Sequence, residues 1–146
     1  MNTESLRMLE HALTYSFSNK SLLQRALTRK AYALENKICE DQEIFRTLGD
    51  AILKAILIDL LIASGAGTRS EITMKKIDLE SAEGLGKVAS SLRLGEYLFL
   101  GAGEEKMNLR NRQYVLSESL EAVVGALYLD GGFESTKDVV ARLFGF

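Results

Sequence analysis

The sequence predicts an all-α protein, and three observations support this fold class. Proline, which breaks helices, is absent from the 146 residues. Apolar residues recur mainly at spacings of three and four, which is the period of a helix face. A composition of 47% hydrophobic and 26% charged residues is typical of a globular domain with a real core. We therefore expect residues 1–146 to form a single helical domain.

The first half of the chain contains a short amphipathic helix, a second helix and one long central helix. Residues 4–13 have the apolar period of the first, and Asn19 is placed to cap the second. We expect residues 32–37 to form a loop. The central helix is expected over residues 41–63. It is apolar on nearly all sides after Gly49, which is typical of a helix that others surround.

Small residues divide the second half into further helices, which we expect over residues 70–79, 81–92, 113–129 and 134–144. Ser81 is a suitable N-cap for the second of these. Gly95, Gly101 and Gly103 indicate a loop region before residue 113, and Asp130–Gly132 ends the helix that follows it. The absence of internal repeats and low-complexity tracts favours one compact bundle.

The balance of charges limits the classes of partner. Eighteen Lys and Arg residues against twenty Asp and Glu residues give a formal net charge of −2. A protein that binds nucleic acid by bulk electrostatic attraction is usually basic, so any such contact must come from local patches. Seven basic residues form either a phosphate-binding rim or an ordinary solvated surface: Lys75, Lys76, Lys87, Arg93, Lys106, Arg110 and Arg112.

Cysteine and histidine are nearly absent, which excludes several kinds of site. With Cys39 and His11 as the only examples, an internal disulfide, a cysteine metal cluster and a multi-histidine zinc site are all excluded. A thiol without a partner is expected to serve only packing, and it fits a reducing cytoplasm. Any metal site must therefore use carboxylates and a hard cation, Mg²⁺ or Mn²⁺.

The sequence predicts no contact with a membrane. The first residues lack the apolar segment of a secretory signal. Lys54 and Asp59 interrupt the apolar run of the central helix, which is typical of a buried helix. We expect a soluble, cytoplasmic protein.

Four carboxylates lie beside the apolar faces of two strongly patterned helices. Glu43 and Asp50 are seven residues apart and share a face of the central helix, while Glu118 and Glu121 share a face of the 113–129 helix. Carboxylates in such places are unfavourable unless they are exposed, paired or bound to a cation. If the two helices pack together, their acidic faces can converge on Mg²⁺. Otherwise each is an ordinary solvated face.

Several motifs together resemble the endonuclease domain of the ribonuclease III family over nearly the whole chain. EIFRTLGDAIL at 43–53 is similar to the signature helix of that family, and LSESLEAVVGALYLDGGF at 116–133 is similar to its second signature. ALTRKAY at 26–32 resembles an early family segment, and residues 70–106 resemble its middle. The resemblance implies a ribonuclease III endonuclease-domain-like helical bundle.

The resemblance implies a homodimeric, Mg²⁺- or Mn²⁺-dependent endonuclease that cuts double-stranded or structured RNA. Asp50 and Glu121 match metal-binding, catalytic positions of the two signatures. Glu118 stands where the family has Asp, so it is a further candidate metal ligand, and Glu43 matches a position associated with structure and dimer contacts. Bacterial members usually carry a C-terminal double-stranded-RNA-binding domain. The chain ends at Phe146 without one, so we expect weak intrinsic affinity for RNA.

The chain departs from the family pattern at functional positions. Arg46 replaces a metal-binding Glu, and Arg69 replaces a further acidic residue. Thr47 replaces the aromatic residue that family members insert into the partner subunit, and Arg29 begins the segment that replaces an early His-x-Ser. With four carboxylates and two guanidinium groups, the site has a net charge of −2. Binding of a dication is therefore expected to be weakened.

Arg46 leaves two arrangements open. Its guanidinium, which is always protonated, can pair with Asp50 or Glu118 and take the place of a bound cation. Alternatively, it turns outward and one metal ion still binds through Asp50 and Glu121. Three hypotheses follow: a ribonuclease III-like endonuclease with impaired activity, a non-catalytic member that binds RNA or protein, and a plain helical dimerisation module.

Overall fold

The computed structural model of the chain describes residues 3–37 and 40–146. Within these residues every regular element is helical, and the nearest thing to a sheet is one isolated bridge between Thr28 and Phe99. The all-α prediction is confirmed. The prediction for Cys39 falls outside the described residues. The elements in chain order are α1 (Thr3–Leu13), α2 (Lys20–Ala26), α3 (Lys30–Glu35), α4 (Glu43–Ala63), α5 (Arg69–Glu80), α6 (Ala82–Ser91), the 3₁₀ turn η1 (Leu94–Tyr97), α7 (Ala102–Lys106) and α8 (Gln113–Phe144).

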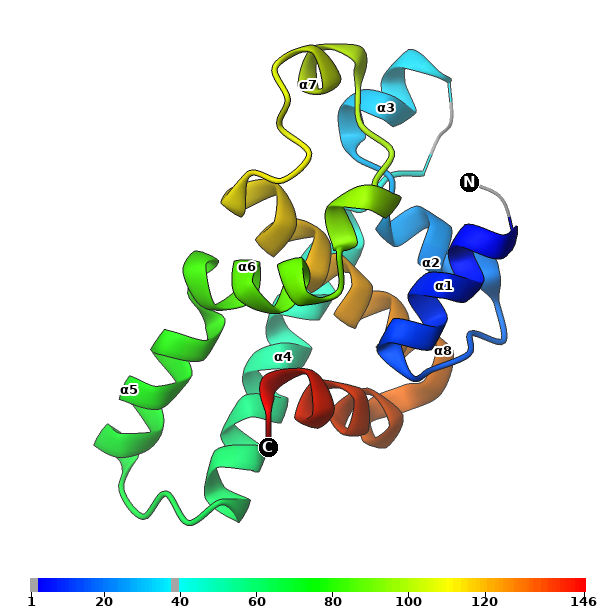
Figure 1. Ribbon diagram of the computed structural model, residues 1–146. Helices are drawn as coiled ribbons and strands as arrows, with labels where there is room; N and C mark the ends of the chain where they lie inside the picture. The colour runs from blue at the N-terminus through cyan, green and yellow to red at the C-terminus, as the bar shows by residue number, and fades with distance from the viewer. Residues whose placement is uncertain (1–2, 38–39) are drawn as a thin grey trace.

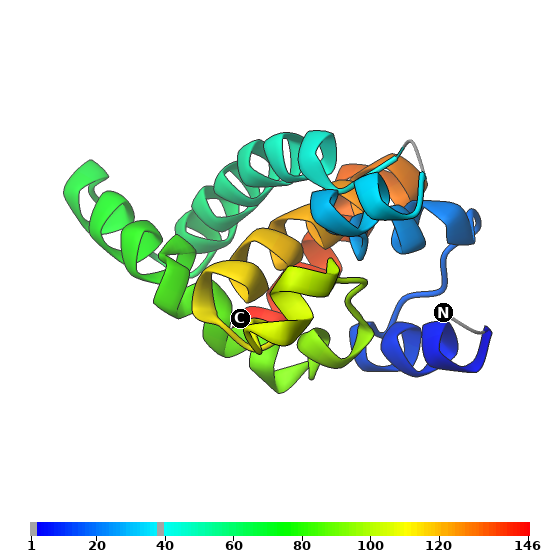
Figure 2. The ribbon, with the colours of Figure 1, turned by 90° about the horizontal axis from the view of Figure 1, so that it is seen from above.

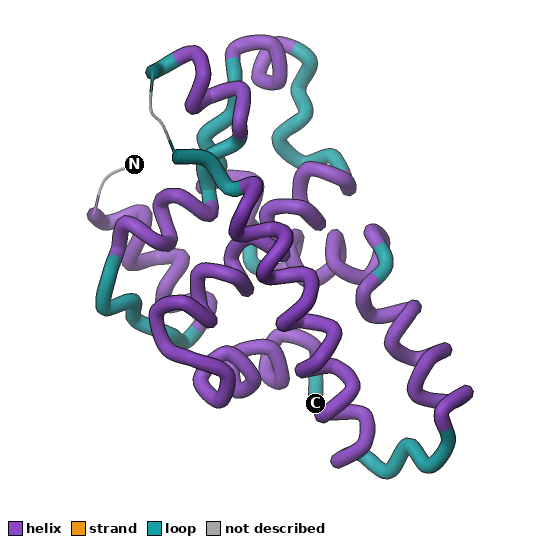
Figure 3. Tube along the Cα trace, turned by 180° about the vertical axis from the view of Figure 1, so that it is seen from behind, coloured by secondary structure: helices purple, strands orange, loops and turns teal. Residues whose placement is uncertain are grey.

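The fold is built on the crossing of α4 and α8, which lie at the centre of the molecule (Figure 1). Two glycines allow the close approach. A side chain at Gly49 would overlap the backbone carbonyl of Glu121, and one at Gly125 would overlap the carbonyl of Phe45. Because the backbones touch here, the polar faces of the two helices are brought close together. Seen from behind, α4 lies in front of α8 and its outer side is uncovered (Figure 3).

The core surrounds the first half of α8. Helices α2, α4 and α6 all pack against it, and α5 projects away at one end of the molecule (Figure 2). Burial of each large apolar side chain contributes about 1.5–3 kcal/mol, so this helix organises much of the hydrophobic stabilisation. Its fully or almost fully buried apolar residues are Val115, Leu116, Leu120, Ala122, Val123, Val124, Ala126 and Leu127.

The expected break after residue 129 is a sharp bend rather than a gap between two helices. Gly132 has φ 84° and ψ −177°, which is a non-helical conformation inside α8 that favours glycine. Asp130 fixes the bend by accepting hydrogen bonds from the Tyr15 hydroxyl at 2.7 Å and from the backbone amides of Ser18 and Asn19 at 2.9 Å. The loop between α1 and α2 is thereby tied to the bend.

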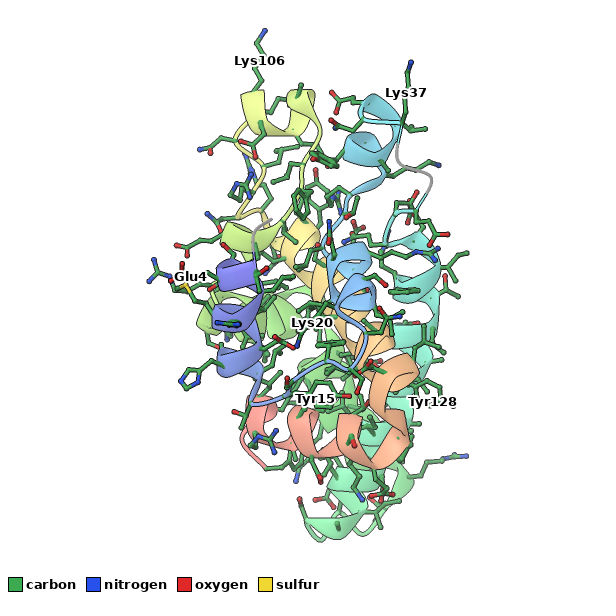
Figure 4. All side chains as sticks on the ribbon, turned by 90° about the vertical axis from the view of Figure 1, so that its right-hand side faces the viewer. Glu4, Tyr15, Lys20, Lys37, Lys106 and Tyr128 are labelled. Carbon is green, nitrogen blue, oxygen red and sulfur yellow. The ribbon has the colours of Figure 1, made fainter. Side chains whose placement is uncertain are left out.

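Two short helices replace segments that we expected to be loops. Residues 32–37 largely belong to α3, and the region around Gly101 and Gly103 contains α7. The two helices stabilise each other, because the carboxylate of Glu35 accepts hydrogen bonds from the backbone amide of Ala102 at 2.9 and 3.0 Å. Together they form one end of the molecule, from which Lys37 and Lys106 point outward (Figure 4).

Capping residues mark several helix starts as the sequence predicts. The side chain of Asn19 accepts a hydrogen bond from the amide of Ser21, and that of Ser81 accepts one from Gly84. Across the described ranges 3–37 and 40–146, no helix has the length and apolar character needed to cross a membrane.

Candidate functional site

The α4–α8 crossing brings together the four carboxylates that the sequence singles out. Glu43 and Asp50 come from α4, and Glu118 and Glu121 come from α8. Their convergence depends on the glycine contact described above, since a wider crossing would separate the two faces. The four carboxylates do not form one uniform cluster. They divide into a pair near the middle of α4 and a pair bound by arginines near its start.

The middle pair consists of Asp50 and Glu121, whose side chains are hydrogen-bonded to each other. Burial, together with this hydrogen bond and the charge of Asp50, raises the pKa of Glu121 to about 7. Burial acts in the same sense on Asp50, but hydrogen bonds from Lys54 and Glu121 bring the pKa of Asp50 below its ordinary value. The two carboxylates therefore avoid repulsion by sharing a proton, which Glu121 holds and Asp50 accepts.

Lys54 is the nearest counter-ion of this pair. Its Nζ lies 3.0 Å from Oδ2 of Asp50, one helical turn away on α4. The side chains of both residues are nearly half exposed, so the ion pair is weak and easily opened. The positive charge of Lys76 on α5 also lowers the pKa of Asp50. The sequence analysis assigned neither lysine to the acidic site, although the spacing of four between Asp50 and Lys54 indicates an ion pair.

The second pair is bound by Arg46. Its Nη1 lies 2.9 Å from Oε2 of Glu43, and its Nη2 lies 3.1 Å from Oε2 of Glu118. The expected pairing with Glu118 is observed, whereas the alternative pairing with Asp50 is not. The Nε of Arg46 is buried and has no hydrogen-bond acceptor among the described residues. Arg46 thus links α4 to α8 through a carboxylate on each helix.

Arg29 binds the other oxygen of Glu118. Its Nη1 lies 2.8 Å from Oε1 of Glu118, and its Nη2 lies 3.0 Å from Oε2 of Glu104. Burial alone would lower the pKa of Arg29, but hydrogen bonds to Glu118 and Glu104 raise it overall. Gln42 completes the contacts of the guanidinium by accepting from Nη1 at 3.2 Å. Both oxygens of Glu118 are therefore occupied by arginines.

The sequence pattern identifies Arg29 as a departure from the family but predicts no role for its side chain. It predicts no role for Glu104 either. Seventy-five residues separate the two, so no local spacing could join them. Arg69 is a separate case. It lies exposed at the start of α5, and the interactions of Asp50 and Glu121 involve Lys54, Lys76 and Arg46 instead. A contribution of Arg69 to the site therefore stays a prediction.

Two hollows adjoin the carboxylates. An open pocket of about 400 Å³ lies over the middle pair and is lined by Glu43, Arg46, Thr47, Asp50 and Glu121. A smaller pocket of about 100 Å³ is lined by Arg29, Lys30, Ala31, Gln42, Glu43, Arg46, Glu104 and Glu118. Among the described residues, no group of three or more acidic, His or Cys side chains is arranged to hold a metal ion. Of the carboxylates that line the open pocket, Glu43 is bound by Arg46, which leaves Asp50 and Glu121 as the pair that no arginine binds among the described residues.

Fold and site together define a class: an all-α domain with a candidate acidic site at the crossing of two central helices. The chain belongs to the ribonuclease III-like family, since the family described as Ribonuclease-III-like matches residues 19–145.

Curated relatives agree with this membership. Ribonuclease 3 of Campylobacter jejuni strain RM1221 is 34% identical over 141 residues, which cover 96% of this chain and 61% of the relative. Ribonuclease 3 of Magnetococcus marinus is 37% identical over 146 residues, covering 95% of this chain and 59% of the relative. The chain therefore spans about three fifths of the length of these curated relatives.

Solved structures show the same fold. A structure of the nuclease domain of ribonuclease III from Campylobacter jejuni superposes with a TM-score of 0.87 at 33% identity and covers 94% of each chain. A crystal structure of the same domain at 2.2 Å resolution gives a TM-score of 0.84, covering 94% of this chain and 92% of that chain. The first is described in terms of a region of that protein involved in dimer formation.

Proposed function

We propose that the 146 residues form one ribonuclease III-like domain that cleaves double-stranded or structured RNA endonucleolytically, with one divalent cation and with activity impaired by Arg46. The contact between Asp50 and Glu121 carries this proposal. Two carboxylates from different helices are held together under an open pocket and share a proton. In such an arrangement a cation can replace the proton and neutralise both groups.

The carboxylates present fit one hard cation. Mg²⁺ takes oxygen ligands, commonly one or two carboxylates together with waters, and Asp50 and Glu121 supply that number. Binding requires the exposed Lys54–Asp50 pair to open, which costs about 0–1 kcal/mol. Glu118 does not fit as a further ligand, because arginines bind both of its oxygens. When bound, the ion would activate a water and stabilise charge on the phosphoryl group.

Arg46 opposes this binding. Its positive charge favours the ionised form of Glu121 and partly offsets the effect of burial, which still raises the pKa of Glu121 to about 7. Two unit charges about 4 Å apart interact by roughly 4 kcal/mol at an effective dielectric of 20, and a divalent ion experiences about twice the repulsion. Held by Glu43 and Glu118, the guanidinium cannot turn away without breaking two ion pairs. We infer weak cation affinity and slow cleavage.

The outer face of α4 supports a homodimer. Its apolar and small side chains recur at helical spacing along the whole helix and are exposed or half-exposed: Ile44, Leu48, Ala51, Ala55, Ile58 and Ile62. An uncovered apolar stripe of this length is typical of an interaction surface. A two-fold axis through the small central residues would place the stripe against its own copy. Thr47 lies at the edge of the stripe and is exposed.

The balance of charges at the site favours RNA as the substrate. The acidic cluster is balanced by Arg29, Arg46 and Lys54, so a phosphate backbone is not repelled from the crossing as it would be by four free carboxylates. The nearly neutral chain still lacks a general attraction for nucleic acid. We infer that RNA is bound weakly by this domain alone and that the dimer supplies much of the contact surface.

The contacts of Arg46 favour one alternative function. If its guanidinium has replaced the cation altogether, the domain is a non-catalytic family member that binds RNA or protein. The ion pairs to Glu43 and Glu118 support this alternative, because they give the fold a fixed internal cation. The two functions differ in their need for Asp50, which the arginine contacts leave free.

Cleavage of a duplex RNA in Mn²⁺ distinguishes them. The matched variants are Asp50→Asn and Asp59→Asn. Asp59 lies on the same helix and forms a comparable ion pair, with Lys137 at 3.0 Å. The proposal expects slow cleavage by the wild type and by Asp59→Asn, and none by Asp50→Asn. Equal cleavage by all three proteins, or none by any of them, contradicts it.

Arg46→Glu tests the cause of the impairment. Removal of the opposing charge should raise the cleavage rate at least tenfold at the same Mn²⁺ concentration, on the order of what a change of a few kcal/mol in cation binding allows. Arg46→Lys keeps the charge and should remain slow. Equal rates for the two variants would show that the charge at this position does not limit the reaction.

A further inference from the structure

Tyr114 is an exposed aromatic residue next to the carboxylates of the site. It lies in the first turn of α8, one turn before Glu118, and therefore on the same face of the helix. Its side chain is 48% exposed, which is unusual for an aromatic residue in a helix whose following residues, Val115 and Leu116, are buried. The core does not use the exposed part of this ring, which leaves it available to a ligand.

One face of the Tyr114 ring is supported by a cation. The guanidinium carbon of Arg29 lies over the ring, 6.0 Å from its centroid, at the outer limit of a cation–π contact. Arg29 itself is held by Glu104 and Glu118 and is only 12% exposed. The ring is therefore backed by a fixed group on one side and is about half exposed to solvent.

Two cations are chain neighbours of the residues in this contact: Lys30 follows Arg29, and Arg112 lies two residues before Tyr114. Lys30 and Arg112 are both exposed, and neither forms an ion pair with any residue the structure describes. Lys30 also lines the 100 Å³ pocket. Arg46, whose Nε has no hydrogen-bond acceptor among the described residues, lines the same pocket. These donors are suited to phosphate or hydroxyl oxygens of a chain that passes the ring. The pocket is too small and too polar to hold a base, which leaves the ring itself as the base contact.

The surroundings favour a nucleobase over an apolar protein segment. Arg112 and Gln113, which precede Tyr114 in the chain, are polar and exposed, and cations close to an aromatic ring suit the phosphates and bases of a nucleic acid. A base within a continuous duplex is stacked on its neighbours and cannot offer its face. Only an unpaired, extruded base can stack on an aromatic side chain.

We propose that Tyr114 is a specificity-determining residue that stacks on an unpaired nucleobase of the RNA, beside the Asp50–Glu121 site. This inference rests on the proposed function and adds a substrate class to it: duplex RNA with a bulged or looped nucleotide near the point of cleavage. Arg29 positions the ring, and Lys30 and Arg112 contact the backbone on either side of the extruded nucleotide.

The test uses two RNA duplexes that differ only by one bulged 2-aminopurine. Stacking on Tyr114 should quench the fluorescence of this base when the full chain binds. Tyr114→Ser should abolish the quenching and weaken binding of the bulged duplex about 5- to 100-fold, the range expected for loss of one base–aromatic stack. Tyr114→Phe should keep both properties. Phe146→Ala removes a comparably exposed aromatic residue just beyond the C-terminal end of α8 and should change neither.

Binding and quenching separate this inference from the proposed function. Loss of affinity by Tyr114→Ser for both duplexes equally would show a general contact and would overturn the stacking proposal, as would unchanged quenching in that variant. Failure of the wild type to cleave either RNA, with quenching intact, would instead contradict the nuclease proposal alone.

Discussion

Arg46 and Glu118 form an ion pair across the crossing of α4 and α8, with 3.1 Å between Nη2 and Oε2. This contact divides the acidic cluster in two. On one side, Glu43 and Glu118 are neutralised by guanidinium groups. On the other, Asp50 and Glu121 share a proton under an open pocket. Because of this division, the Asp50–Glu121 pair can still bind one cation, whereas Glu118 is no longer available as a ligand for a second.

The shared proton predicts how stability depends on pH. Because burial raises the pKa of Glu121 from 4.5 to about 7, the folded state holds this proton more tightly than the unfolded chain does. Stability should therefore fall as pH rises from about 4.5 to about 7, by about 1–2 kcal/mol after allowance for partial exposure. The lowered pKa of Asp50 acts in the opposite sense, and only near and below its ordinary value of 3.8.

Thermal melts of the wild type and Glu121→Gln across this pH range measure the effect. The difference in melting temperature between the two proteins should change steadily between pH 4.5 and 7, since only the wild type loses the proton. A constant difference over that range would show that Glu121 titrates normally.

The close approach of α4 and α8 predicts a large cost for Gly49→Ala. The added methyl group would meet the carbonyl of Glu121 on the facing backbone, which cannot rotate away. Overpacking of this kind costs about 1–3 kcal/mol or more, and it would also move the two acidic faces apart.

Gly103→Ala is the matched control, because it lies inside helix α7 and nothing lies within 4 Å of its added Cβ. It should be neutral or stabilising by up to about 1 kcal/mol. Urea unfolding of both variants measures these changes, and a Gly49→Ala protein as stable as the wild type would exclude a tight crossing.

Features of the fold that depend on local sequence were predictable, and features that depend on contacts between distant residues were not. The long helices were predictable because their apolar period is strong, and their boundaries agree to within a few residues. The short helices α3 and α7 were missed because each depends on a contact from far along the chain, such as the Glu35 carboxylate at the start of α7.

The same reasoning applies to the site. The convergence of Asp50 and Glu121 could be inferred from two helix faces and a resemblance. The role of Arg29 could not, because its partners Glu104 and Glu118 lie 75 and 89 residues away. Lys54 was within reach of sequence reasoning, since it is four residues after Asp50 on the same helix. A spacing of four on one helix face is sufficient to predict this ion pair.

The exposed stripe of α4 predicts the interface of a dimer. Ala51→Asp places a charge at its centre, where the side chain is exposed and no other contact of the fold is lost. The variant should sediment as a monomer with unchanged helical circular dichroism. Leu129→Asp, at an exposed position on α8, should leave the association state as it is. A dimer that survives Ala51→Asp would place the interface elsewhere.

Titration with Mn²⁺, followed by calorimetry and by the paramagnetic resonance signal of the free ion, tests the division of the acidic cluster most directly. We predict one ion per chain for the wild type, none for Asp50→Asn, and one ion bound about tenfold more tightly by Arg46→Gln. Proton release on binding should accompany the loss of the shared proton. Two ions bound by the wild type, or binding unaffected by Asp50→Asn, would contradict it.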